Sequence, residues 1–162
     1  MVQPRTLAAT AAAVTATAVT GGLGTDVSSR WYARLDKPSW QPPGWLFGPV
    51  WTSLYALIAV GTARALDGAE HRESDPRARR DLRVAIGVNL VLNVLWTWLF
   101  FAWKRPRLAL AEILLLEAST VDLIRRCSRY DATSGRLLAP YAAWVAFATA
   151  LTAELVRRNP GA

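Results

Sequence analysis

Two asparagines in one apolar stretch are the first side chains in this sequence that could do chemistry. The run 84–103 contains four residues that share one helical phase: Asn89, Asn93, Trp96 and Phe100. At about 100° per residue, these positions form a narrow stripe on a helix. An amide inside a membrane must face protein, a cavity or a ligand, because lipid offers no hydrogen-bond partner. The stripe therefore indicates either helix packing or polar contacts to a bound molecule.

Tryptophan and proline are concentrated between residues 31 and 55. This segment holds four of the chain's eight tryptophans and four of its nine prolines. Proline lacks a backbone donor and pushes the preceding residue toward an extended conformation. We therefore expect a rigid loop over about 25–44 that leads into a long helix. The loop either forms an interfacial aromatic belt or covers something beneath it.

Three acids interrupt the apolar run 108–124. Asp122 is expected to pair with the arginines three and four residues further on. Glu112 is expected to reach water or the basic turn 104–107. Glu117 lies near mid-membrane without a partner in its own helix, so it is either a functional group or an acid bonded across helices. Glu112 and Glu117 differ by about 140° around the axis, so they do not form a paired-carboxylate site.

No other group of side chains has the spacing of a catalytic or metal site. The single cysteine, Cys127, and the single histidine, His71, exclude an intramolecular disulfide and a Cys/His zinc cluster. No nucleophile–base pair is visible, so the sequence gives no positive case for hydrolysis or group transfer. The formal net charge is +7, but basic residues do not alternate with aromatics on an exposed helix, so nucleic-acid binding is not expected.

Apolar runs of about twenty residues, separated by charged connectors, must position these side chains. They predict an all-α membrane protein in which residues 1–162 form a single domain, a five-transmembrane-helix bundle with a Pro/Trp-rich loop between helices 1 and 2. We expect a multi-pass integral protein of a bacterial cell membrane. The first run could instead be a cleaved signal peptide, because Arg5 precedes it and Ala16–Ala18 is similar to a peptidase site. The expected spans are about 7–24, 45–66, 84–103, 108–124 and 137–156, with a polar connector at 67–83 and a loop at 125–136.

Residues from three of these helices fall at one depth beneath the loop, counting a rise of about 1.5 Å per residue from the loop side. Together they predict an aromatic-walled cavity that also offers an amide and a phenol. Such a cavity suits a large, flat, mostly apolar ligand. The residues are Trp51, Tyr55, Asn93, Trp96, Trp144 and Ala148.

Three sequence blocks resemble the TspO/MBR family of tryptophan-rich sensory and translocator proteins. The first joins Trp31-Tyr-Ala-Arg-Leu-Asp-Lys-Pro-Ser-Trp-Gln-Pro-Pro-Gly-Trp45 to Gly48-Pro-Val-Trp-Thr-Ser-Leu-Tyr55. The second is Leu92-Asn-Val-Leu-Trp-Thr-Trp-Leu-Phe-Phe101, and the third is Leu137-Leu-Ala-Pro-Tyr-Ala-Ala-Trp-Val-Ala-Phe-Ala-Thr149. A Trp-Tyr…Lys-Pro-x-Trp-x-Pro-Pro string followed by Pro-Val-Trp is improbable by chance.

The resemblance implies a five-helix bundle, usually a homodimer, whose first loop covers a pocket for porphyrins and drug-like or steroid ligands. The expected ligand is a protoporphyrin-type tetrapyrrole or another flat apolar molecule, with membrane lipid around the protein and no required cofactor or metal. Sterol binding is not expected, because 151–157 lacks the tyrosine of the cholesterol-recognition pattern. The implied ligand-binding residues are Trp31, Tyr32, Trp40, Trp51, Asn93, Trp96, Trp144, Phe147 and Ala148, to which the depth argument adds Tyr55.

Three functions remain open on the sequence. The first is a receptor or carrier that binds tetrapyrroles between its helices and acts in porphyrin handling and stress-linked regulation. The second, also implied by the resemblance, is light- and oxygen-dependent porphyrin degradation with Trp51 and Trp144 as redox partners. The third is a partner-docking module. Because His71 and Cys127 are poorly placed for axial ligation, we expect metal-free porphyrin to bind at least as well as haem.

Overall fold

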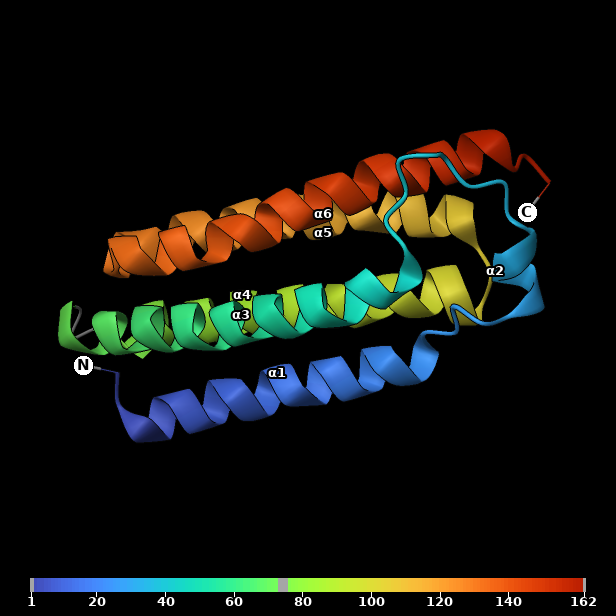
Figure 1. Cartoon of the computed structure of the whole chain (residues 1–162). Coiled ribbons are helices and arrows are strands. Elements are labelled where there is room, and N and C mark those ends of the chain that lie inside the picture. The colour runs from blue at the N-terminus through green and yellow to red at the C-terminus, as the bar shows by residue number, and fades with distance from the viewer. Residues whose placement is uncertain (1, 73–75, 162) are drawn as a thin grey trace.

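The structure is a computed structural model that describes residues 2–72 and 76–161. Within these residues the protein is all-helical and contains no strand. Figure 1 shows the long helices side by side along one axis, with the two termini at opposite ends. The helices are α1 Pro4–Gly24, α2 Arg30–Arg34, α3 Gly44–Arg72, α4 Pro76–Thr97, the π-helix η1 Trp98–Ala102, α5 Pro106–Tyr130 and α6 Ala132–Arg158.

The long helices form one bundle in which α5 packs between α4 and α6, and α1 packs against α3 and α4. Two polar contacts fix α1 to its neighbours. The Thr10 hydroxyl donates to the Ala59 carbonyl oxygen at 2.9 Å, and the Trp98 indole N–H donates to the Thr20 carbonyl oxygen at 2.9 Å. Gly24 lies against the Trp98 ring, where an added Cβ would come within 2.9 Å of it. The small residue thus permits close approach of α1 to η1.

The segment 125–136, which we expected to be a loop, is helical except at Asp131, so that prediction was wrong. The polar connector expected at 67–83 is also mostly helical. α3 continues to Arg72, α4 begins at Pro76, and only Asp131 separates α5 from α6. Arginine, alanine and glutamate are good helix formers, so polarity alone does not end a helix. Proline fits a first helical turn, and the Asp131 carboxylate caps α6 by accepting from the Thr133 N–H at 2.7 Å. The connector residues 73–75 lie outside the described residues.

Among the described residues, four helices are long and apolar enough to cross a membrane: α1, α3, α4 with η1, and α6. The helix α5 is not among them, and it contains Glu112, Glu117 and Asp122. It nevertheless lies within the bundle against α4 and α6. The structure therefore shows an all-helical protein with four candidate membrane spans.

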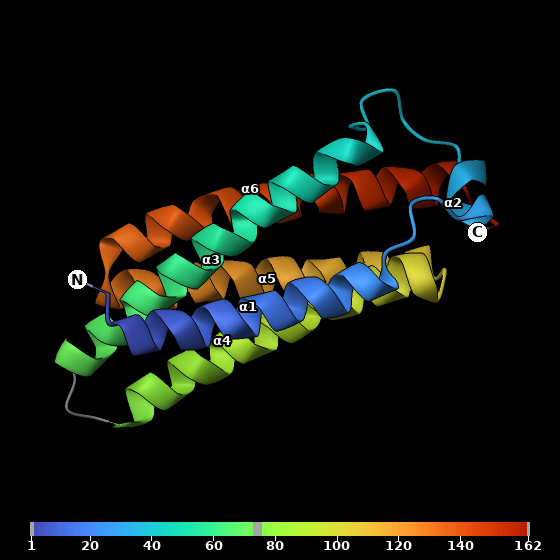
Figure 2. The same ribbon diagram turned by 60° about the horizontal axis from the view of Figure 1, so that its bottom comes forward.

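The chain between α1 and α3, residues 25–43, is called the lid segment below. It contains α2, which Ser29 caps by accepting from the Tyr32 N–H at 3.2 Å. Residues 35–43 form no helix, as expected where three prolines remove backbone donors. Figure 2 shows this part of the chain arching from α2 past the last turns of α6 before α3 begins. The lid segment therefore covers one end of the bundle.

Candidate ligand-binding site

A cavity of about 100 Å³ lies beneath the lid segment, among α3, η1 and α6. Its wall is almost entirely apolar, with threonine and tyrosine as the polar exceptions. We call it the aromatic cavity. It is lined by Thr25, Val27, Tyr32, Phe47, Trp51, Trp96, Thr97, Phe100, Phe101, Trp144, Ala148, Leu151, Thr152 and Leu155.

The π-helix η1 shapes one wall of the aromatic cavity. Its backbone hydrogen bonds reach five residues back, so its turn is wider than an α-helical turn. The wider turn lets the consecutive residues Phe100 and Phe101 both face the cavity, beside Trp96 of α4. Phe100 stacks on Trp96 at 5.7 Å between ring centroids, and Phe101 meets Trp96 edge-on at 6.2 Å. Single π-turns often occur at functional sites.

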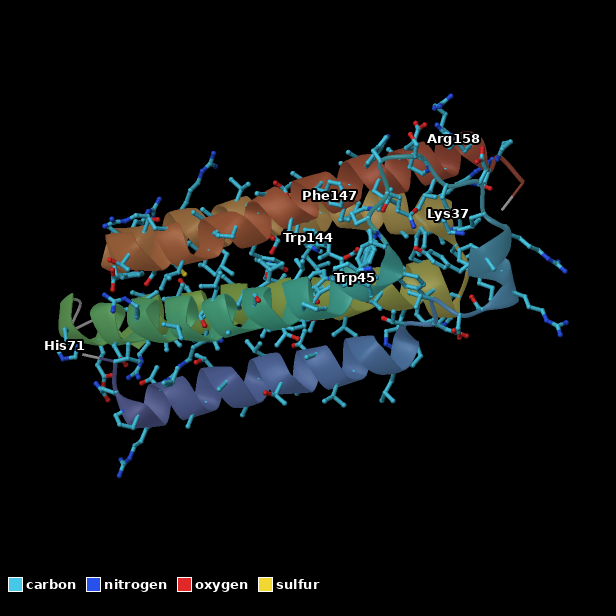
Figure 3. The ribbon with its side chains drawn as sticks, viewed as in Figure 1. Lys37, Trp45, His71, Trp144, Phe147 and Arg158 are labelled. Atoms are coloured by element: carbon cyan, nitrogen blue, oxygen red, sulfur yellow. The ribbon has the colours of Figure 1, made fainter. Side chains whose placement is uncertain are left out.

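Aromatic contacts join the lid segment to the bundle. The Trp31 ring meets Phe100 edge-on at 5.6 Å, and the Trp40 ring meets Phe147 at 5.9 Å. Figure 3 shows Trp144 and Phe147 on α6, on the side that faces α3, with Lys37 and Arg158 toward the lid end. Edge-to-face pairs of this kind contribute about 0.5–1.5 kcal/mol beyond their buried area. The lid segment is therefore held partly by ring contacts that can be broken singly.

Tyr32 is the aromatic residue of the lid segment that lines the aromatic cavity. Its hydroxyl accepts a hydrogen bond from the Gln41 amide at 3.0 Å. The Lys37 ammonium donates to the Tyr32 carbonyl oxygen and lies 4.6 Å from the centre of its ring. Burial raises the pKa of the Tyr32 hydroxyl by more than the Gln41 hydrogen bond lowers it. The hydroxyl therefore stays protonated and can donate to a ligand.

A second set of contacts, which are polar, joins the lid segment to the end of α6. The Asp36 N–H donates to the Asn159 side-chain oxygen at 2.9 Å, and the Asn159 amide donates back to the Asp36 carbonyl oxygen at 3.0 Å. The Arg158 guanidinium lies 3.6 Å from the Asp36 carboxylate. These contacts are exposed, so water competes with them and each contributes little.

A chain of polar side chains continues below the aromatic cavity into the core. The Tyr55 hydroxyl donates to the Asn93 side-chain oxygen at 3.0 Å, and the Asn93 amide donates to the Tyr141 oxygen at 3.2 Å. The Tyr141 hydroxyl in turn donates to Asn89 at 3.2 Å, whose amide donates to Thr120 at 3.0 Å. We call this the buried polar network. It joins α3, α4, α5 and α6 without any ionised group.

The residues predicted from the sequence occupy three kinds of position. Those that line the aromatic cavity are Tyr32, Trp51, Trp96, Trp144 and Ala148. Tyr55 and Asn93 do not line it, because they belong to the buried polar network. Trp31, Trp40 and Phe147 do not line it either and form the outer ring contacts of the lid segment.

Several lining residues were absent from the predicted set although helical spacing could have found them. Phe47 lies one turn before Trp51, and Thr152 and Leu155 continue the α6 face that bears Ala148. Phe101 could not have been found by phase, because a regular helix would turn it away from Phe100. The two lid residues Thr25 and Val27 lie in a segment without periodicity.

The acids of α5 differ from expectation. Glu112 was expected to reach water or a basic turn, but it is 5% exposed and both carboxylate oxygens are buried without a partner. That prediction was wrong, because Glu112 falls on the inner face of α5 with Ala109 and Leu116. Asp122 pairs with Arg126 at 2.6 Å, as predicted. Glu117 is half-buried, with one oxygen unpartnered.

Neither Cys127 nor His71 lies at the aromatic cavity. Cys127 is fully buried in the main hydrophobic cluster with Leu123 and Leu138. Figure 3 places His71 at the end of the bundle opposite Lys37 and Arg158. In the described part of the chain, no group of three or more His, Cys, Asp or Glu side chains is arranged to hold a metal ion.

A family model for the TspO/MBR family matches residues 8–158, which is most of the chain. The chain belongs to the TspO/MBR family. It is therefore a multi-pass integral membrane protein, in agreement with its apolar helices. The match extends over all the helices that surround the aromatic cavity and over the lid segment.

Individual relatives come from distant organisms. The chain is 34% identical over 133 residues to a tryptophan-rich protein TspO of Chlorobaculum tepidum, covering 82% of each chain. It is 36% identical over 135 residues to a human translocator protein, covering 82% of this chain and 76% of the relative. It is 34% identical over 131 residues to a tryptophan-rich sensory protein of Cereibacter sphaeroides, covering 80% and 77%.

Proposed function

We propose that this TspO/MBR family member binds tetrapyrroles such as protoporphyrin in the aromatic cavity, as a receptor or carrier in porphyrin handling and stress-linked regulation. In this proposal the whole chain is one membrane domain and α5 is its fifth span. The domain acts as a homodimer and needs no cofactor.

The observation that carries the proposal is the aromatic cavity itself. Trp51, Trp96 and Trp144 come from three different helices and surround one space. A flat conjugated ring gains dispersion and quadrupole contacts from aromatic walls on several sides. Thr97, Thr152 and Tyr32 supply a few hydroxyl groups that could orient the ligand.

The size of the aromatic cavity requires the lid segment to move when a ligand enters. Pockets for drug-sized ligands have volumes of about 300–1,000 Å³, and this cavity has about 100 Å³. Helix positions in the core are fixed by packing and by the buried polar network. The lid segment is held by ring contacts and exposed hydrogen bonds, so its displacement costs least.

Titration of the purified protein with metal-free protoporphyrin tests the proposal, with tryptophan fluorescence quenching and porphyrin absorbance as readouts. We expect saturable quenching, and Trp51→Ala should weaken binding by about tenfold through loss of a ring contact. Trp45→Ala is the matched control, because Trp45 is 74% exposed and does not line the cavity. Equal affinity for both variants, or no quenching at all, would reject the proposal.

Trp40→Ala tests the role of the lid segment separately. Removing the Trp40–Phe147 contact should weaken porphyrin binding while the bundle stays folded. Circular dichroism and the unfolding temperature monitor the fold. An unchanged affinity would indicate that the lid segment does not close over the ligand.

A second candidate function is light- and oxygen-dependent porphyrin degradation. It is favoured by one observation, that the two easily oxidised side chains Trp51 and Trp144 both line the cavity in which the porphyrin would lie. Illumination of the porphyrin-bound protein in air should then give a new bilin-like absorbance that Trp51→Phe or Trp144→Phe abolishes. Bleaching at the rate of free porphyrin would favour simple binding.

A further inference from the structure

A second cavity, of about 320 Å³, lies at the end of the bundle opposite the lid segment. It is formed where the start of α1, the end of α3 and the junction of α5 and α6 meet. We call it the polar cavity. Figure 3 labels one of its lining residues, His71, far from Lys37 of the lid segment and Arg158 at the end of α6.

A buried carboxylate lines the polar cavity. Asp67 is 5% exposed, and its Oδ2 accepts from the Gln3 N–H at 2.6 Å. Its Oδ1 has no hydrogen-bond partner among the described residues. A buried acceptor without a partner is costly, because its desolvation is not offset. Asp67 therefore uses Oδ2 to accept from Gln3, whereas its Oδ1 can accept from a bound ligand.

A donor without a partner lies in the same cavity. The Arg64 Nη2 pairs with the Asp131 carboxylate at 2.8 Å, but its Nε is buried and has no partner among the described residues. The His71 Nδ1 donates to the Asp67 carbonyl oxygen at 2.6 Å, so Nε2 of the neutral ring is a second acceptor beside Asp67. The polar cavity thus offers an acceptor and a donor together, so it complements a group that has both a cationic N–H and an anionic oxygen.

The position of the polar cavity indicates the source of such a group. The candidate span α1 begins beside it at Pro4, the candidate span of α3 ends there at His71, and α6 begins there at Ala132. In a bilayer this level is the membrane–water interface, where lipid headgroups lie.

We propose that the polar cavity binds the phosphoethanolamine headgroup of a phospholipid, with the ammonium beside Asp67 and the His71 Nε2 and the phosphate beside Arg64. Phosphatidylcholine is disfavoured, because its trimethylammonium group has no N–H to donate and keeps only the charge attraction. A purely anionic headgroup is disfavoured by the two carboxylates, Asp67 and Asp131.

The first test needs no mutation. The detergent-solubilised protein is titrated with dioleoylphosphatidylethanolamine, its N-methyl and N,N-dimethyl derivatives, and dioleoylphosphatidylcholine, and bound lipid is counted by native mass spectrometry. Affinity should fall along the series and be roughly tenfold lower for the choline lipid, as expected for loss of charge-assisted hydrogen bonds. Equal affinity along the series would overturn the proposal.

The variant Asp67→Asn tests whether the ethanolamine lipid binds in the polar cavity. The substituted amide keeps an oxygen acceptor for the Gln3 N–H, so the contact between α3 and the residue before α1 remains, while the negative charge is lost. The variant should bind the ethanolamine lipid only as well as the choline lipid. Asp122→Asn is the matched control, because Asp122 is an exposed acid paired with Arg126 away from this cavity. An undiminished ethanolamine preference in Asp67→Asn would overturn the proposal.

A soluble probe separates the lipid from a free ligand of the same chemistry. O-phosphoethanolamine added in large excess should compete only weakly, because it lacks the acyl chains that anchor the headgroup. Competition at concentrations similar to those of the lipid would assign the polar cavity to a soluble zwitterion and overturn the lipid assignment. Neither outcome depends on porphyrin binding at the other end.

Discussion

The two ends of the bundle enclose cavities of opposite character. At the lid end, aromatic rings surround about 100 Å³, and a long connecting segment closes over them. At the other end, charged side chains surround about 320 Å³, and α5 passes to α6 through Asp131 alone. The lid end therefore has to move to admit a ligand, whereas the polar cavity is formed by helix ends that are already in place.

The buried polar network separates these two ends. Its amides, phenols and hydroxyls satisfy one another across four helices, so the middle of the bundle offers no free polar group to a ligand from this network. Fully satisfied networks of this kind make a core rigid. We expect changes at one end to leave binding at the other end unaltered.

Glycine substitution should show the largest difference between the ends. A Cβ added at Gly68 would lie 2.8 Å from the backbone oxygen of Tyr130, which cannot move without shifting α5. Gly68→Ala should lower the free energy of unfolding by about 2 kcal/mol, as overpacked cores do. At the lid end, Gly24→Ala meets the Trp98 ring, and moving this ring strains its hydrogen bond to Thr20 without displacing a backbone, so the cost should be smaller, about 1 kcal/mol. Unfolding in detergent measures both.

Gly87→Ala provides the control for these glycine variants. Nothing lies within 4 Å of an added Cβ at Gly87, so this change should stabilise α4 by up to about 1 kcal/mol through helix propensity alone. If Gly68→Ala and Gly87→Ala changed the free energy of unfolding equally, α3 and the end of α5 would not pack as closely as the structure shows.

A smaller effect is expected when the polar contacts of the lid segment are removed. Asn159→Ala deletes the reciprocal pair of hydrogen bonds with Asp36. Because both are exposed, we expect at most about 1 kcal/mol of stability loss but a several-fold faster porphyrin release, measured by stopped-flow exchange. Arg126 pairs with Asp122 on α5 and is absent from the contacts that hold the lid segment, so Arg126→Ala is a suitable control. An identical release rate in both variants would show that Asn159 does not hold the lid segment.

The sequence predicted the helices better than it predicted where they end. Apolar runs located every long helix, because burial in lipid or in a core requires them. The ends were misplaced where arginine-rich segments continue as helix, since charge moves a residue out of the membrane without breaking its backbone hydrogen bonds. Hydropathy alone does not decide whether α5 crosses the membrane. Three acids make α5 less apolar, although its inner face is buried in the bundle.

The residues of the aromatic cavity could be predicted from the sequence where they lie on regular helices. Trp51, Trp96 and Trp144 were found by depth, and all three line it. Asn93 was assigned to a ligand because lipid offers an amide no hydrogen-bond partner. The sequence placed Tyr55 at the same depth, but only the fold shows that Tyr55 and Tyr141 themselves satisfy this amide. The π-turn at η1 also escapes sequence periodicity, because one extra residue in a turn alters the phase of those that follow.

The smallest predicted effect is a pH dependence at the polar end. Burial by itself raises the pKa of Asp131, but the hydrogen bond from the Thr133 N–H and the charge of Arg64 lower it more, so its pKa in the folded protein lies below the usual 3.8. A carboxylate with a lowered pKa stabilises the fold above its unfolded-state pKa, and this contribution is lost as the pH falls through the folded-state value. Stability should therefore decrease below about pH 4, near the ordinary pKa of an aspartate. Asp131→Asn keeps an N-cap acceptor for α6 but cannot titrate, so its unfolding temperature should change less between pH 5 and pH 3. An equal change in both proteins would assign the acid sensitivity to other carboxylates.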